Sequence, residues 1–207
     1  FSERALKKLS SMGIVALHAC DAPSYALGER PDILQDLDER GALPMRVFLY
    51  HDELPNFAIR SGAGLNGGHI AYAGLKLFAD GSLGARTAAL NEPYSDKDDE
   101  CGRLLYTDEK LMEKLRAAQK RRIQVQVHAI GDAANEQVVR CMEAVQRELG
   151  RPTFSYRLNH AIVLPEGMPE RIARAGIVVD LQPIQMWDDR NMAPLRLGGR
   201  LYRRAYQ

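Results

Sequence analysis

The order of apolar and polar positions along the chain predicts alternating strands and helices. Six short segments are typical of strands, at residues 14–17, 45–50, 74–78, 124–128, 156–160 and 177–181. Residues 124–128 and 156–160 alternate apolar with polar side chains, and the other segments are mainly apolar. Five segments have apolar residues spaced as on one face of a helix, at residues 2–12, 31–40, 107–118, 132–149 and 169–175. Repeated strand–helix units predict an α/β fold with a parallel sheet and helices packed outside it.

Two architectures fit this pattern: an open doubly wound sheet and an opened β/α barrel. The first strand is not followed by G-x-G-x-x-G, and G-x-x-x-x-G-K-[ST] occurs nowhere in the chain. Nucleotide-binding folds therefore lose support.

Polar residues that could take part in catalysis or metal binding lie where the predicted strands end. In chain order they are His18 and Asp21, His51 and Asp52, Lys76 and Asp80, His128 and Asp132, His160, and Asp180 and Gln182. Ligands of parallel α/β folds bind at the carboxyl ends of the strands. The chain has five histidines, and four of them lie at or just beyond these ends, which indicates a site there.

Lys76 is an unusual residue because it lies between Leu75 and Leu77 in a strand expected to be buried. A buried ammonium is costly unless it is paired or neutralised. One interpretation is an ion pair with Asp80, four residues later. The other is a neutral amine that has captured carbon dioxide, giving a carbamate that can bridge two metal ions.

Two histidines on successive strands favour a metal site over isolated structural roles. Gln124, Gln126 and His128 are expected on one face of their strand, and His160 ends the next strand. Imidazole together with oxygen ligands suits zinc and similar divalent ions. His18 is expected to pack or to support the site from behind, and His51 and His69 to be loop residues.

Charge and composition exclude several classes of partner. The chain has 207 residues, with 28 Lys and Arg against 27 Asp and Glu, so nothing draws it to nucleic acid or to a membrane surface. The arginine-rich segment 190–204 is expected to be a solvated helix or loop. Three cysteines without C-x-x-C spacing argue against a disulfide framework and fit a reducing cytoplasm. No apolar run approaches the ~18 residues of a membrane span.

Residues 74–90, from Gly74 through Lys76, Asp80 and Arg86 to Leu90, closely resemble the signature of amidohydrolase family 3, relatives of N-substituted formamide deformylase. Residues 127–132 and 158–161, with His128 and His160, agree with the family in order and spacing. Residues 12–18 and 182–183 agree as well, so the resemblance runs through nearly the whole chain.

The resemblance implies a (β/α)8 barrel that holds one or two divalent ions, zinc foremost, at its C-terminal mouth. A metal-activated water would hydrolyse a small amide-type or formamide-type substrate at a non-peptide C–N bond. Lys76, carboxylated, and His128 and His160 match the family's metal ligands. Four further residues are expected to shape the pocket or support the ligands: Asp80, Arg86, Asp132 and His18.

Several family features are not found in this sequence. They are the His-x-His pair of the first strand, the aspartate of the eighth strand that acts as general base, and the small β-domain; Asn159 also replaces the usual Glu. Residues 1–207 are therefore interpreted as a partial catalytic barrel, about strands 2 to 7, with no catalytic base identified and little or no activity by itself.

Other interpretations remain open. A truncated barrel would serve as a non-catalytic binding or assembly module, and its open sheet edges would favour a homo-oligomer. A barrel enzyme of another class, a lyase or an isomerase, is a further alternative. The sequence does not name the substrate.

Overall fold

The strands form one sheet whose order follows the sequence. The computed structural model describes residues 2–20, 31–54 and 69–206, so Asp21 lies outside the described residues. Six strands pair in the order β1-β2-β3-β4-β5-β6, and the pairs β1–β2, β2–β3, β4–β5 and β5–β6 are parallel. A doubly wound sheet reverses its strand order, whereas a (β/α)8 barrel does not. The predicted partial α/β barrel is confirmed.

The chain divides into two compact units, residues 1–76 and 77–207. The elements of the first unit are α1 (Ser2–Ser11), β1 (Ala16–Ala19), α2 (Pro31–Glu39), β2 (Arg46–His51) and most of β3 (Ile70–Phe78). Its core joins Leu6 of α1 and Leu34 of α2 to Val47 of β2. Amphipathic helices thus cover the apolar strands of this unit.

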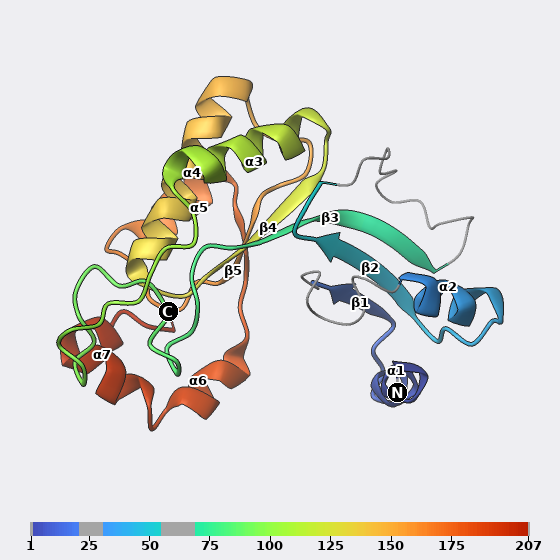
Figure 1. Ribbon diagram of the computed structural model, residues 1–207, viewed down its shortest axis with the longest axis horizontal. Helices are drawn as coiled ribbons and strands as arrows, with labels where there is room; N and C mark the ends of the chain where they lie inside the picture. Colours follow the sequence, from blue (N-terminus) through green and yellow to red (C-terminus); the bar gives the residue numbers. More distant parts are fainter. Residues whose placement is uncertain (1, 21–30, 55–68, 207) are drawn as a thin grey trace. The chain divides into compact units, whose positions relative to one another are not determined.

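The second unit contains the remaining helices and strands. They are α3 (Asp108–Lys120), β4 (Gln124–Ala129), α4 (Asp132–Leu149), β5 (Arg157–His160), α5 (Met168–Ala175), β6 (Val178–Asp180), α6 (Pro183–Asp189) and α7 (Ala193–Tyr202). Helices α3, α4 and α5 lie together on one side of β4 and β5 (Figure 1), and α4 contacts α3, α5 and β4. None of the helices in the described parts of the chain is long and apolar enough to cross a membrane.

Local sequence signals account for the helices beside the candidate site. Thr107 caps α3, with its Oγ1 accepting a hydrogen bond from the amide of Lys110 at 3.4 Å. Val138, Met142 and Val145 of α4 are fully buried, as their spacing predicts. Gly150 ends α4 with a φ of 79°, a backbone angle that favours glycine.

Two strand boundaries differ from the prediction. Strand β1 begins at Ala16, two residues late, and Val15 is 70% exposed. Strand β3 begins at Ile70, four residues early. Its first residues pair with β2, beginning with Ile70 opposite Val47. The local pattern of apolar and polar residues does not indicate this pairing with a distant strand.

The prediction of a solvated segment at residues 190–204 is wrong for one of its faces. Ala193, Leu197 and Leu201 of α7 are four residues apart, and all three are buried in a core cluster with Leu83 and Tyr94. Ala193 and Leu197 share one face of the first part of α7, and Leu201 follows a kink at Gly198, where φ is 62°. The burial of all three outweighs the polar composition of the segment.

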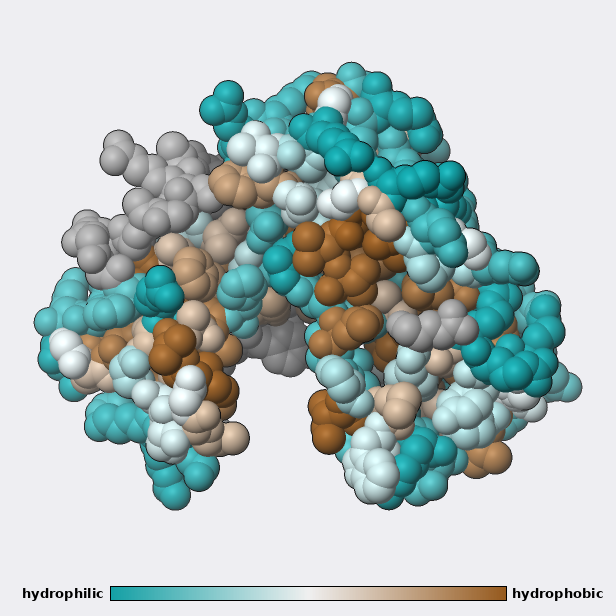
Figure 2. Space-filling view, turned by 180° about the vertical axis from the view of Figure 1, so that it is seen from behind, coloured by the Kyte–Doolittle hydropathy of each residue, from teal (hydrophilic) through white to brown (hydrophobic). Residues whose placement is uncertain are grey.

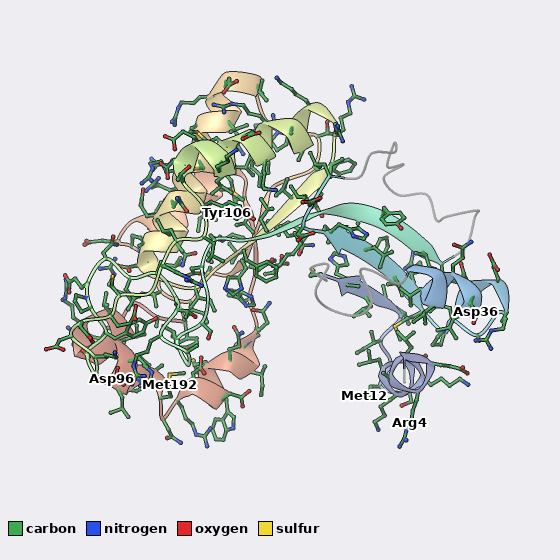
Figure 3. All side chains as sticks on the ribbon, viewed as in Figure 1. Arg4, Met12, Asp36, Asp96, Tyr106 and Met192 are labelled. Carbon is green, nitrogen blue, oxygen red and sulfur yellow. The ribbon has the colours of Figure 1, made fainter. Side chains whose placement is uncertain are left out.

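The arginines of α7 tie the helix to the loop before α3. Arg196 pairs with Asp96, which also binds Arg86, and Arg200 pairs with Glu92. The backbone amide of Ser95 donates to the carbonyl of Arg196 at 2.8 Å. Asp96 lies beside α7, near Met192 (Figure 3).

The loop between β3 and α3 passes very close to the start of α4. A Cβ on Gly131 would lie 1.9 Å from the carbonyl oxygen of Ala89. Real Cβ atoms do not approach an oxygen so closely, so this passage requires glycine. The amide of Ala133 donates to the same carbonyl at 3.1 Å, which holds the two segments in contact.

We expect Leu197→Ala to lower the free energy of unfolding by about 2–5 kcal/mol, because it leaves a cavity in the core. Leu195→Ala is the matched control on the same helix, since Leu195 is 65% exposed, and its effect should stay within about 0.5 kcal/mol. Urea unfolding of the intact protein measures both. Equal effects would contradict the burial of this face of α7.

We expect Gly131→Ala to destabilise the protein by about 1–3 kcal/mol or more, because the backbone of Ala89 must move away from the new methyl group. Gly84→Ala is the control, because nothing lies within 4 Å of a Cβ at Gly84. Thermal unfolding of the two variants side by side should show a loss for Gly131→Ala alone.

Candidate metal centre

Two histidines from adjacent parallel strands meet at the carboxyl end of the sheet. His128 is the penultimate residue of β4 and His160 is the last residue of β5. Their ring centroids are 4.6 Å apart, with an angle of 73° between the rings. Two predicted ligand residues are therefore neighbours in space.

An unusual backbone angle at His160 produces this meeting. The amide of Asn159 reaches Gln126, with Nδ2 and Oε1 3.4 Å apart, so Asn159 shares the face of the sheet that carries Gln126 and His128. Strict alternation would place His160 on the opposite face, with Leu158. Instead His160 has a φ of 75°, and its ring lies against that of His128.

The left-handed backbone continues into Ala161, with a φ of 49°. Such angles cost about 1–3 kcal/mol each and persist only where the surroundings hold them. Here the amide of Ala161 donates to Ala129 at 3.1 Å, and that of Val163 donates to Ile130 at 2.9 Å. A strained turn held by its neighbours supports a functional role for this strand end.

Hydrogen bonds define which nitrogen of each imidazole carries a proton. Nε2 of His128 lies 2.7 Å from the carbonyl oxygen of Gly81. A carbonyl only accepts, so Nε2 carries the proton and a neutral ring presents its lone pair at Nδ1.

His160 has the opposite arrangement. Its Nδ1 lies 2.7 Å from Oε1 of Gln182. The amide nitrogen of Gln182 donates to the carbonyl of Asp180 at 3.2 Å, which orients Oε1 toward the ring. The neutral His160 ring therefore presents its lone pair at Nε2. One nitrogen bonded to an oxygen and the other presented as a lone pair is the usual state of a metal-ligating histidine.

Asp80 organises the loop behind His128. Its carboxylate is buried and accepts hydrogen bonds from the amides of Ala89, Ile130 and Gly131 at 2.9, 3.0 and 2.8 Å. Oδ1 also lies 3.3 Å from Nε2 of His128. Asp80 thereby fixes both the loop and the imidazole.

Asp132 holds a structural position beside this site. Its carboxylate accepts hydrogen bonds from the backbone and side chain of Asn91, both at 3.0 Å. It therefore ties the loop to the first turn of α4.

Arg86 is engaged on the same loop. It forms a two-point pair with Asp96 at 3.1 and 2.9 Å, and this guanidinium holds the pKa of Asp96 below its usual range. Its observed partner is thus a carboxylate of its own loop. Its predicted pocket role stays a prediction.

Lys76 and His18 belong to the first unit. Lys76 is only 4% exposed within the apolar end of β3, as predicted from its neighbours. His18 is the penultimate residue of β1, and its ring contacts those of Phe48 and Tyr50, at centroid distances of 5.5 and 5.2 Å. Their assigned roles, as a metal ligand and as a supporting residue, stay predictions.

Sequence reasoning missed a polar network beside the histidines. Asp180 of β6 accepts hydrogen bonds from Arg157 and Asn159 of β5, at 2.9 and 2.7 Å, and Asn159 extends the network to Gln126. The alternation of polar residues in 157–159 carried a signal for it. The partner in β6 emerges only from strand pairing.

The donor set decides which metal chemistry fits. Among residues 2–20, 31–54 and 69–206, no three His, Cys, Asp or Glu side chains form a group able to hold a metal ion. Burial raises the pKa of Cys141 to about 11, so this thiol is protonated at neutral pH and unsuited to metal binding. The two imidazoles fit a divalent ion, and a complete site needs further oxygen ligands.

Curated relatives match part of the chain. The protein YtcJ of Bacillus subtilis, whose name classes it with the amidohydrolases, is 43% identical over 119 residues, 58% of this chain and 22% of its own length. The protein LONG AFTER FAR-RED 3 of Arabidopsis thaliana is 36% identical over 125 residues, 60% of this chain and 21% of its own length. The chain thus matches about a fifth of the length of these relatives.

Solved structures match nearly all of the chain. Two are described as metal-dependent hydrolases, from Pyrococcus horikoshii and Pyrococcus furiosus. Their TM-scores are 0.81 and 0.82, and their identities are 27% and 30%. Each covers 99% of this chain, which spans 40% and 42% of theirs.

The family model described as amidohydrolase family, Amidohydro_3, matches residues 1–206. This match agrees with the strand order and with the paired histidines at the strand ends. The chain belongs to this amidohydrolase family.

Proposed function

We propose that this chain carries part of the active site of a metal-dependent hydrolase acting on non-peptide C–N bonds of amide or formamide type. The observation that carries the proposal is the pair His128 and His160 at two strand ends, whose ring centroids are 4.6 Å apart. Their hydrogen bonds leave a lone pair at Nδ1 of His128 and at Nε2 of His160. Family membership and the metal-dependent hydrolases among the similar structures support it.

His128 and His160 would hold the ion through Nδ1 and Nε2, and zinc suits imidazole with oxygen ligands. We propose a carbamate on Lys76 as a further, anionic oxygen ligand, because the side chain is buried and matches the lysine of the family signature in residues 74–90. When bound, a divalent ion supplies an activated water and a Lewis acid for the amide carbonyl.

The residues of this chain contribute orientation and proton placement. The Gly81 carbonyl and the Gln182 amide hold the imidazole protons away from the ligating nitrogens. Asp80 binds the backbone amides of Ala89, Ile130 and Gly131. These bonds hold the loop beside the end of β4, where Gly81 accepts the proton of His128. Ligands held by such supporting bonds need little rearrangement when a metal binds.

A cytoplasmic location is part of the proposal. The cysteine count is odd, and Cys141 is a buried thiol, which fits a reducing compartment.

We expect chelation to abolish hydrolysis of simple amides by an intact protein in which this chain is joined to the rest of the barrel, and added zinc to restore it. His160→Ala should lower kcat/KM at least about 100-fold and reduce bound zinc, because one ligand is lost. Amide turnover and metal content are measured on the same samples.

His69→Ala serves as the matched control. His69 is an exposed histidine whose Nδ1 lies 2.9 Å from Asp38, and its loss should leave both readings unchanged. Full turnover in metal-free protein would refute the proposed function.

We expect the intact protein to take up a ¹³C label from bicarbonate as a carbamate on Lys76, with release of the label in acid. ¹³C NMR detects the signal. Lys76→Arg should remove it, because a guanidinium forms no such carbamate. Lys110→Arg should keep it, since Lys110 is a solvent-exposed partner of Glu113. A signal that survives Lys76→Arg would exclude Lys76 as the modified residue.

A further inference from the structure

A pocket opens beside His160 in the second unit, where β5 and β6 lead into the following segments. Its volume is about 180 Å³. Its lining consists of His160, Ile162, Leu181, Gln182, Pro183, Gln185, Met186 and Tyr206. None of the pocket and supporting residues expected from the sequence lies in this lining.

The pocket is joined to the candidate metal centre through two of its walls. His160 is one wall, and Gln182, which bonds to Nδ1 of His160 at 2.7 Å, is another. A molecule that reacts at the histidine pair would therefore extend a neighbouring group into this pocket.

The chemistry of the lining favours an uncharged apolar group. Ile162, Leu181, Pro183 and Met186 supply apolar surface, and no Asp, Glu, Lys or Arg is among the lining residues. The lining offers a carboxylate or an ammonium no side chain of opposite charge, so such a group would gain less from entering than an apolar group.

Tyr206 keeps the pocket neutral on its polar side. Its hydroxyl donates to Oδ2 of Asp189 at 2.6 Å. Burial and the Asp189 carboxylate raise the pKa of Tyr206 well above its usual range, so the phenol remains protonated at neutral pH. Its proton is already committed to Asp189.

The volume of the pocket gives a scale for the group that it can hold. An apolar cavity of about 150 Å³ is known to bind benzene. The pocket beside His160 is slightly larger. It therefore suits a phenyl ring or a branched alkyl chain of similar size.

The pocket is open enough for such a group to enter. Leu181 and Met186 are each 55% exposed, although they line it. Further apolar side chains of the second unit gather in brown patches on the face seen in Figure 2. Exposed apolar walls gain free energy when an apolar group covers them.

We propose that this pocket selects amide substrates whose substituent beside the scissile bond is uncharged, apolar and up to about the size of a phenyl ring. The proposal rests on the proposed hydrolase function and names its substrate class. The substituent belongs either to the acyl side or to the amine side of the amide, and both present the same apolar surface.

Two substrate series measure the preference on the intact, zinc-loaded protein. The acyl series comprises N-methyl amides of acetic, 3-methylbutanoic and benzoic acids. The amine series comprises acetamides of methylamine, isobutylamine and aniline. In one series kcat/KM should rise at least about tenfold from the methyl to the larger groups, and that series identifies the side that enters the pocket.

Variants of α6 tie the preference to the pocket. Met186→Lys should remove the preference for apolar groups and favour a carboxylate-bearing analogue instead, because it places a cation in the lining. Ile184→Lys is the matched control, since Ile184 is 62% exposed on the same helix and does not line the pocket. It should retain the wild-type preference.

Titration calorimetry with the same amides separates failure of this inference from failure of the hydrolase proposal. Hydrolysis with the same kcat/KM for the small and the large groups within each series would overturn the proposed substrate preference and leave the hydrolase proposal standing. Equal effects of Met186→Lys and Ile184→Lys on kcat/KM would do the same. Binding of the larger amides that is lost only in Met186→Lys, without any turnover, would sustain the pocket and overturn the hydrolase proposal.

Discussion

The carboxylate of Asp80 joins the loop after β3 to the end of β4 through hydrogen bonds to backbone amides. The arrangement of the candidate site depends on these hydrogen bonds. A buried charge is tolerated only when it is well hydrogen-bonded. Asp80 accepts hydrogen bonds from the backbone amides of Ala89, nine residues later, and of Ile130 and Gly131, 50 and 51 residues later in the chain. Hydrogen bonds to charged groups contribute about 1.5–3 kcal/mol each. The loop therefore has little freedom to adopt another path.

Several features of the site follow from this constraint. The Gly81 carbonyl, next to Asp80, accepts the proton of His128. The Ala89 backbone is held against Gly131, where only glycine leaves enough room. The left-handed backbone at His160 then brings the second imidazole to the first. Loop, strand end and ring orientation thus form one connected arrangement.

Much of this could be predicted from local sequence. Alternating strands and helices, the buried Lys76 and the positions of His128 and His160 at strand ends all followed from periodicity and residue type. The face of α7 that carries Leu197 was missed because the arginines around it dominate the composition. The unpredicted α6 is short and exposes most of its apolar residues, so no amphipathic period marked it.

Other features depend on distant partners and could not be predicted. The extension of β3 to Ile70 requires its pairing with β2. The turn at His160 is stabilised by the ends of neighbouring segments, and nothing in residues 157–161 specifies a φ of 75°. The pocket beside His160 is formed by residues up to Tyr206, which the sequence pattern did not connect to the site.

We propose that His128 and His160 ligate one divalent ion together with oxygen donors. X-ray absorption spectroscopy of the intact, zinc-loaded protein tests it most directly. We expect two imidazoles among the ligands of the zinc ion, with the remaining donors nitrogen or oxygen at about 2.0–2.2 Å. A sulfur ligand at about 2.3 Å, or a spectrum unchanged when His128 and His160 are both replaced by alanine, would contradict it.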